Sequence, residues 1–366
     1  MKRIFVLPLS MFFAVPLFIA NPMLAQGPGA PRPAQNAPDG GIRVRVQIVT
    51  APVSVRDAKN NVITNLQKED FHVFDNGVEQ TIDSFDLGTE PLSCVFVLED
   101  SSRVAAILPA VRKSAIVFTD TVVGASGEGS VIGYDSAIQQ LQPFTQDNDK
   151  IERAIANLKT GNTGARLYDA IFSAVAQLRS RPPEFRRVMI VVGEPLDIGS
   201  ASKLGAALRS AQINNIVIYS VALSVNSTSL RSDPKQAGSA PTTPPGTFGT
   251  PPSSGTAQTP SSEQQRSGNI DLLALSEWTV RNALALVKEH PLEIATTATG
   301  GAYLATVRDR SIENAVDSIG GELNAQYTLS YRPAKSNEPG YHTIKITLDR
   351  PGLKVRTRPG YFLEGQ

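Results

Sequence analysis

The stretch Cys94-Val95-Phe96-Val97-Leu98-Glu99-Asp100-Ser101-Ser102-Arg103 decides the fold class of this chain. Residues 94–98 form an apolar run, which has the length and pattern of a strand buried on both faces. Polar residues follow directly, and in residues 104–123 apolar side chains recur at helical spacing. A buried strand followed by an amphipathic helix is the repeating unit of a parallel α/β sheet.

The same alternation continues toward residue 224. The pattern predicts a hairpin of strands 130–134 and 137–141, helices at 151–158, 167–178 and 201–213, and strands at 188–192 and 216–222. Helical connections of this length join parallel strands through right-handed crossovers. We therefore expect an α/β fold with a doubly wound, mostly parallel sheet covered on both faces.

A segment rich in Pro, Ser, Thr and Gly interrupts this pattern at residues 225–268. Such a composition buries no core, so it predicts a disordered surface insertion. A helix at 270–288, a strand at 301–306 and a helix at 312–323 are predicted after it. The sequence thus indicates one domain, residues 92–325, with an insertion inside it.

Both ends of the body show strand patterns. Residues 42–91 contain alternating runs at 44–48 and 71–74 and a hairpin signal, Asp75-Asn76-Gly77, before a connector at 84–91. Residues 326–366 predict strands at 327–332, 341–348 and 354–361. We expect the two segments to pair in one β subdomain.

The amino-terminal residues are typical of an export signal. Lys2 and Arg3 precede an apolar run at residues 4–20, and a cleavage-like site follows. We expect a signal peptide at 1–25 and a flexible tether at 26–41, and therefore a secreted or periplasmic protein with no membrane span after signal removal. Retention of the apolar run as an anchor is the alternative.

Composition argues against several classes of function. The 35 basic and 34 acidic residues give a net charge of +1 with no dense basic stripe, which disfavours a nucleic-acid partner. The single cysteine, Cys94, lies in the apolar run and predicts core packing. One cysteine excludes an intrachain disulfide and cysteine-type zinc clusters.

No catalytic constellation is found. His72, His290 and His342 stand in separate segments without metal-ligand spacing. The glycines that follow Gly127 lie between a helix and the next strand, which reverses the dinucleotide-binding order. Carboxylates such as Asp135, Asp169 and Asp197 stand at turns and helix starts, where Asp caps backbone amides. The sequence predicts a protein that is not an enzyme.

Three stretches resemble the von Willebrand factor A-related family of secreted bacterial proteins. Two of them, Val53-Ser-Val-Arg-Asp-Ala-Lys and Asn65-Leu-Gln-Lys-Glu-Asp-Phe-His-Val-Phe-Asp-Asn-Gly, are similar to the family's amino-terminal β segment. The third and most specific is similar to its carboxy-terminal ending: Gln326-Tyr-Thr-Leu-Ser-Tyr-Arg-Pro followed by Pro351-Gly-Leu-Lys-Val-Arg-Thr-Arg-Pro-Gly-Tyr-Phe. The likeness spans nearly all of residues 42–362. It implies an A-type domain that binds partners through loops at the carboxyl ends of its strands.

The resemblance also implies a divalent-cation site, which this chain alters. The family pattern is Asp-x-Ser-x-Ser after the first strand, and here it is replaced by Glu99, Ser101 and Arg103. A shift of one residue gives Asp100 and Ser102 but puts Val104 in the last place. Thr163 matches the family's Thr loop.

The acidic position after the fourth strand is altered as well. It carries Glu194 where Asp is expected, with Asp197 nearby. A guanidinium about 4 Å from a divalent cation would be repelled by roughly 8 kcal/mol at an effective dielectric constant of about 20. We favour the hypothesis that Arg103 takes the place of the cation and bridges Glu99 and Glu194.

Two alternatives remain for these residues. One is a weak Mg²⁺ site built from Glu99, Ser101, Thr163 and Glu194. The other is a set of solvated loop residues. We expect no other cofactor.

The predicted function is binding of an extracytoplasmic protein, as in adhesion, through loops 101–103, 161–166 and 194–197. The residues expected to take part are Glu99, Asp100, Ser101, Arg103, Thr163, Glu194 and Asp197. A structural or assembly role in the cell envelope is the alternative, and metal-dependent adhesion is a lesser one.

Overall fold

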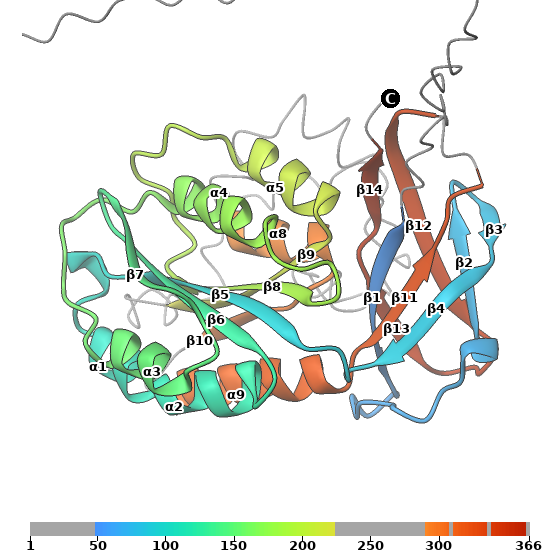
Figure 1. The fold of residues 1–366 in the computed structure, drawn as a ribbon, viewed down its shortest axis with the longest axis horizontal. Coiled ribbons are helices and arrows are strands. Elements are labelled where there is room, and N and C mark those ends of the chain that lie inside the picture. Colours follow the sequence, from blue (N-terminus) through green and yellow to red (C-terminus); the bar gives the residue numbers. More distant parts are fainter. Residues whose placement is uncertain (1–47, 224–289, 307–309, 335–337, 364–366) are drawn as a thin grey trace, which may run out of the picture. The chain divides into compact units, whose positions relative to one another are not determined.

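The computed structural model of the protein describes residues 48–223, 290–306, 310–334 and 338–363 (Figure 1). The predicted signal peptide, tether, insertion at 225–268 and helix at 270–288 lie outside the described residues. The predicted strand at 44–48 also lies outside them, except for Ile48, which precedes the first strand.

A six-stranded sheet forms the centre of the α/β part. Its order is β10-β9-β8-β5-β6-β7, with β5 (Leu92–Glu99) between β6 (Glu128–Tyr134) and β8 (Arg186–Gly193). The outer strands are β9 (Ile216–Leu223), β10 (Tyr303–Thr306) and β7 (Ile138–Thr145). All neighbouring pairs are parallel except β6 and β7, which form the predicted hairpin. Numbered from β5 along the chain, the order is the 3-2-1-4-5-6 of doubly wound folds, so the predicted fold class is confirmed.

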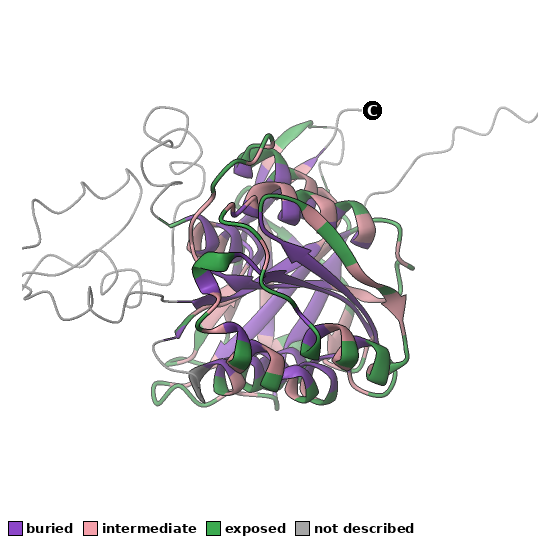
Figure 2. Cartoon of the chain, turned by 90° about the vertical axis from the view of Figure 1, so that its left-hand side faces the viewer, coloured by how far each residue is buried: buried purple, intermediate pink, exposed green. Residues whose placement is uncertain are grey.

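Helices cover both faces of this sheet (Figure 1). One face carries α1 (Leu108–Lys113), α2 (Ala115–Val117), α3 (Asn148–Ala156) and α9 (Arg310–Asn324), and the other carries α4 (Leu167–Leu178), α5 (Leu204–Ile213) and α8 (Pro291–Thr299). Side chains of β5 enter the two cores alternately: Cys94 and Phe96 on one side, Val95 and Val97 on the other. Figure 2 shows the buried strands between helices whose outer faces are exposed.

Two four-stranded sheets form the β part. One has the order β13-β1-β11-β4, from Lys354–Thr357, Val49–Arg56, Tyr327–Tyr331 and Ile82–Leu87. The other has the order β14-β12-β2-β3, from Gly360–Leu363, Gly340–Leu348, Phe71–Asp75 and Val78–Gln80, and the short helix η1 (Lys68–Asp70) precedes β2. Each sheet therefore pairs strands from both ends of the chain, and apolar side chains of the two sheets share one core.

The prediction of one continuous helix at 104–123 is wrong. The chain forms η2 (Ser102–Val104), α1, α2 and a π-helical turn, η3 (Phe118–Val123). Pro109 lies in the first turn of α1 and has no N–H to donate to a preceding turn, so a helix cannot run through it unchanged. Gly124, with φ of 65°, ends the segment.

Two further expectations are wrong at the chain ends. The connector at 84–91 begins as strand β4, which pairs antiparallel with β11, because a distant partner supplies its hydrogen bonds. The strand at 354–361 is two strands in different sheets, β13 and β14. Pro359 lies between them and donates no ladder hydrogen bond, so the chain crosses from one sheet to the other there.

Candidate functional site at the carboxyl edge of the parallel sheet

The strand order reverses between β5 and β8, and open α/β sheets bind ligands beside the carboxyl ends of the strands at such a point. Glu99 is the last residue of β5 and is only 1% exposed. One of its carboxylate oxygens accepts from Ser101 Oγ at 2.6 Å, and the other accepts from the backbone N–H of Glu194 at 2.6 Å. Burial raises the pKa of Glu99. Its side chain is therefore occupied in joining the two strand ends.

Arg103 lies in the η2 turn and pairs with Glu194. Its Nε donates to Glu194 Oε2 at 2.7 Å. Within the described residues the guanidinium makes no hydrogen bond to Glu99, because that carboxylate already has Ser101 and the Glu194 amide as donors. Of the two glutamates that Arg103 was predicted to bridge, it therefore pairs with Glu194 and not with Glu99.

Gly193 allows the strand ends to approach this closely. A Cβ at position 193 would lie 2.1 Å from Tyr134 Oη and 2.9 Å from Glu99 Oε2. Tyr134 is fully buried, and none of the described residues hydrogen-bonds to its hydroxyl. Only glycine leaves room for the tyrosine and the glutamate at the end of β8.

Asp100 and Asp135 form a second acidic pair beneath the loops. Asp100 is 4% exposed, and within the described ranges its Oδ1 has no hydrogen-bond partner. Burial, reinforced by the charge of Asp135, raises the pKa of Asp100 to about 7. Burial also opposes ionisation of Asp135, but the amides of Asn162 and Ala137 donate to it and keep its pKa below the usual value.

Asp135 is a residue of the site that the sequence pattern did not predict. The sequence feature that could have indicated it is its position directly after β6, because side chains that follow neighbouring parallel strands lie at the same edge of the sheet. Its expected role with backbone amides is observed, but one of those amides belongs to the distant loop residue Asn162.

Three loops are held together at this edge. The N–H of Ser102 donates to Asn162 O at 2.8 Å, and Gly161 N–H donates to Asp100 O at 2.7 Å. Ala165 and Ile198 exchange two backbone hydrogen bonds of 3.2 and 2.7 Å. The segments 101–103, 161–166 and 194–198 therefore form one continuous surface, which we call the top-loop surface.

Asp169 and Asp197 secure the outer part of this surface. Asp169 pairs with Arg166 at 2.6 Å and accepts the amides of residues 201 and 202, at 3.0 and 2.8 Å. Asp197 accepts the N–H of Tyr168 at 3.0 Å. Both carboxylates connect different loops, so their contacts stabilise the surface.

The predicted binding residues separate by exposure. Glu99, Asp100 and Ser101 are buried, so they support the loops from inside. Those that reach the surface are Arg103, Thr163, Glu194 and Asp197, with Arg103 and Thr163 the more exposed.

A divalent cation fits this arrangement poorly. The guanidinium of Arg103 holds the carboxylate of Glu194, and both oxygens of Glu99 accept short hydrogen bonds. Among the described residues, no group of three or more His, Cys, Asp or Glu side chains is arranged to hold a metal ion. Mg²⁺ needs about six oxygen ligands in an octahedron, and the carboxylate oxygens of Glu99 and Glu194 already accept hydrogen bonds from neighbouring groups.

The sheet order, the antiparallel edge strand and the site at the strand-order reversal define a von Willebrand factor A-like fold. No protein-family model and no curated protein matches the sequence.

Solved structures that align with the chain include a von Willebrand factor type A protein from Catenulispora acidiphila, with 8% identity and a TM-score of 0.42 over 81% of this chain and 74% of that chain. The conserved hypothetical protein BatB from Bacteroides thetaiotaomicron aligns with 12% identity and a TM-score of 0.40 over 63% of this chain and 98% of that chain. The SpRpn10 VWA domain aligns with 16% identity and a TM-score of 0.30 over 36% of this chain and 75% of that chain.

Proposed function

We propose that this chain is an exported, non-catalytic binding module that holds a partner protein on its top-loop surface without a metal ion. The observation that carries the proposal is the Arg103–Glu194 ion pair, which stands where the strand order reverses. A surface built from three loops tied by backbone hydrogen bonds is preorganised, which lowers the entropy cost of binding. Export rests on the sequence of residues 1–25.

The carboxylates of the site support binding over catalysis. A general acid or base needs a proton-transfer partner within reach of a substrate. Asp135, Asp169 and Asp197 instead accept backbone amides that connect loops. Asp100 is buried beneath the loops.

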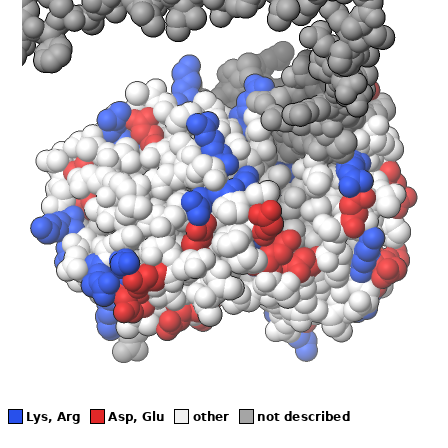
Figure 3. Space-filling view, in the orientation of Figure 1, with Lys and Arg blue, Asp and Glu red and all other residues white. Residues whose placement is uncertain are grey.

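Surface charge supports a protein partner over a nucleic acid. Figure 3 shows acidic and basic side chains interspersed on the face in view, with neither sign dominating it. Nucleic-acid binding requires a concentrated basic footprint. The described ranges contain no helix that is both long enough and apolar enough to cross a membrane.

The metal-free part of the proposal is tested by titrating Mg²⁺, Mn²⁺ and Ca²⁺ into the full chain and into an Arg103→Ser variant. We expect no binding to the wild type below about 1 mM, because the guanidinium repels the ion. Binding by the variant alone would support the replacement of the cation by Arg103. Submillimolar binding by the wild type would overturn it.

The partner-binding part is tested with a photo-crosslinking residue at Thr163, which is exposed on the top-loop surface. A matched control carries the same residue at Ala176, which is exposed on α4. We expect adducts with another protein at position 163 only, and their persistence in a metal chelator. Adducts between copies of this chain, or equal labelling at both positions, would favour a structural role in the envelope.

A further inference from the structure

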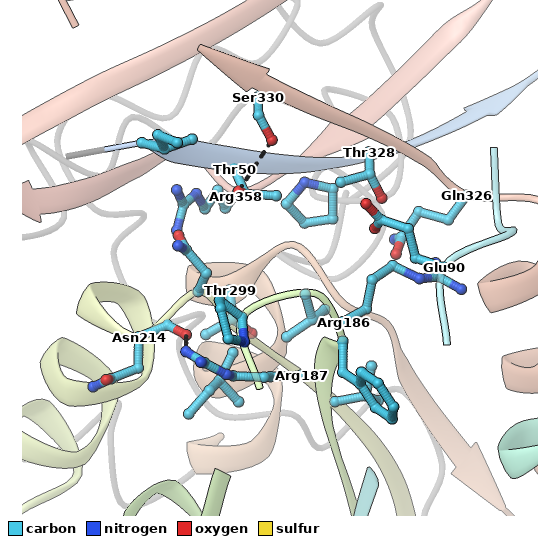
Figure 4. A pocket seen from close by; sticks show the side chains of 18 of the residues that line it. Thr50, Glu90, Arg186, Arg187, Asn214, Thr299, Gln326, Thr328, Ser330 and Arg358 are labelled. Atoms are coloured by element: carbon cyan, nitrogen blue, oxygen red, sulfur yellow. Dashed lines mark hydrogen bonds between the residues drawn. The ribbon is translucent and has the colours of Figure 1, made fainter. Parts of the chain in front are cut away.

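A pocket lies at the opposite ends of the parallel strands from the top-loop surface. Its volume is about 380 Å³. Arg186 and Arg187, the first residues of β8, lie on one side of it, and Thr50 and Ser330, on the paired strands β1 and β11, lie on the other (Figure 4). Arg358, between β13 and β14, completes the cationic part of the lining. The pocket is therefore enclosed by both the α/β part and the β part of the chain.

Of the described residues that line this pocket, three carry a guanidinium and one, Glu90, carries a carboxylate. Their hydrogen bonds within the described residues go to backbone carbonyls: Arg186 to Leu323 O, Arg187 to Asn214 O and Arg181 O, and Arg358 to Gln212 O. None of the three is in an ion pair with a described carboxylate. Arg181, by contrast, lies nearby in the sequence and is paired with Glu128 at 2.6 Å.

The donors of these guanidiniums are incompletely used. Arg358 is 3% exposed, and its Nε has no hydrogen-bond partner in the part of the chain that the structure describes. The Nε atoms of Arg186 and Arg187 are also buried without a partner among the described residues, as is the Oγ1 of Thr328 in the pocket wall. A buried cation without a counter-charge is costly. Glu90 and Asp86 partly offset Arg186, and Asp75 partly offsets Arg358, whereas desolvation alone shifts the pKa of Arg187.

Burial lowers the pKa of Arg358 to about 10, which leaves the guanidinium charged at neutral pH. Figure 4 shows Arg187 and Arg186 extending to different sides of the pocket, toward Asn214 and toward Glu90. The positive charge is thus distributed around the cavity, and Glu90 and Asp86 partly offset the charge of Arg186.

The rest of the lining includes apolar side chains. Phe185, Val188, Ile216 and Val217 contribute surface at the amino ends of β8 and β9. A volume of about 380 Å³ falls in the range of small-molecule sites. Apolar walls beside fixed cationic donors favour a ligand that carries an apolar body and an oxyanion.

We propose that this pocket binds a small organic oxyanion, a carboxylate or phosphate ester with a compact apolar body, between the guanidiniums of Arg186, Arg187 and Arg358. Guanidinium forks match the planar and tetrahedral oxyanions of these two classes. The site is separate from the top-loop surface and does not depend on the function proposed for that surface.

The test uses the full chain and titrates phenyl phosphate, benzoate and inorganic phosphate at constant ionic strength, with neutral benzamide as the uncharged control. We expect phenyl phosphate or benzoate to bind more tightly than inorganic phosphate, and benzamide not to bind. Arg187→Gln and Arg358→Gln should each weaken binding at least tenfold, because each removes a charged donor. Arg179→Gln, which removes an exposed charge at the end of α4, should leave binding unchanged.

Failure of all three anions to bind, or equal binding by wild type and Arg187→Gln, would overturn the proposal. Circular dichroism and thermal melting check that each variant is folded. Arg187 is only partly buried, so we expect Arg187→Gln to fold. This variant alone can test the proposal if Arg358→Gln does not fold. An unchanged affinity in Arg103→Ser would distinguish this pocket from the top-loop surface.

Discussion

Arg103 Nε and Glu194 Oε2 are 2.7 Å apart, although 91 residues separate them in the sequence. Their side chains are 36% and 13% exposed, so solvent screens the ion pair. A double-mutant cycle with Arg103→Gln and Glu194→Gln should give a coupling free energy of about 0.5–1 kcal/mol in chemical denaturation. The more exposed Lys150–Asp147 pair is the control and should give less. No coupling between positions 103 and 194 would mean that the pair does not persist in solution.

Gly193 offers a test of the packing beneath the site. Gly193→Ala should destabilise the fold by about 1–3 kcal/mol, because its Cβ would collide with Tyr134 Oη. Adding Tyr134→Phe should recover part of that loss, since it removes the colliding hydroxyl. Gly205→Ala in α5 has open space around the new Cβ and should stabilise by about 0.5–1 kcal/mol. Additive effects at positions 193 and 134 would contradict the collision.

Glu322 joins the α/β part to the β part. It is 5% exposed and accepts hydrogen bonds from Tyr219, Arg56 and Arg356. Glu322→Ala should cost about 3–5 kcal/mol in urea denaturation, because it leaves two arginines without their shared counter-charge. Asp317→Asn, an exposed change on the same helix, should cost less than about 0.5 kcal/mol. Equal effects of the two substitutions would show that the network contributes little.

His72 should make stability depend on pH. Hydrogen bonds to Glu79, at 2.7 Å, and to Asp349, at 2.9 Å, raise its pKa above 6.5. A raised pKa means that the folded state holds the proton more tightly, so the stabilisation is full below pH 6.5 and is lost as the pH rises through the folded-state pKa. The difference in urea midpoint between wild type and His72→Gln should therefore shrink from about pH 5.5 to about pH 8.5. A constant difference would argue against this cause.

Cys94 should be unreactive in the folded protein. It lies in β5 with no exposed surface, and burial raises the pKa of its thiol. A thiol reagent should modify it only when the protein unfolds, so modification rates should rise with denaturant in parallel with unfolding. Rapid labelling in native buffer would contradict the burial of this strand.

The sequence predicted much of the site but not its contacts. Residues 99, 101, 103 and 194 were identified by aligning the ends of two apolar strands with the pattern of the family that the chain resembles, and strand ends can be located from a local pattern. The pairing of Asp100 with Asp135 was missed, because two carboxylates at the ends of different strands meet only when those strands are neighbours. The basic pocket had no sequence signal, since Arg186 and Arg358 are 172 positions apart by their numbers.

By itself, the sequence determined the α/β class, the hairpin at Asp75-Asn76-Gly77 and most strand positions, because side-chain periodicity and turn chemistry act over a few residues. Tertiary structure alone decided which carboxylates are buried and which glutamate Arg103 pairs with. It also decided that the chain crosses from one sheet to the other at Pro359. Those outcomes depend on strand order and on desolvation, and both arise only when segments far apart in the chain pack together.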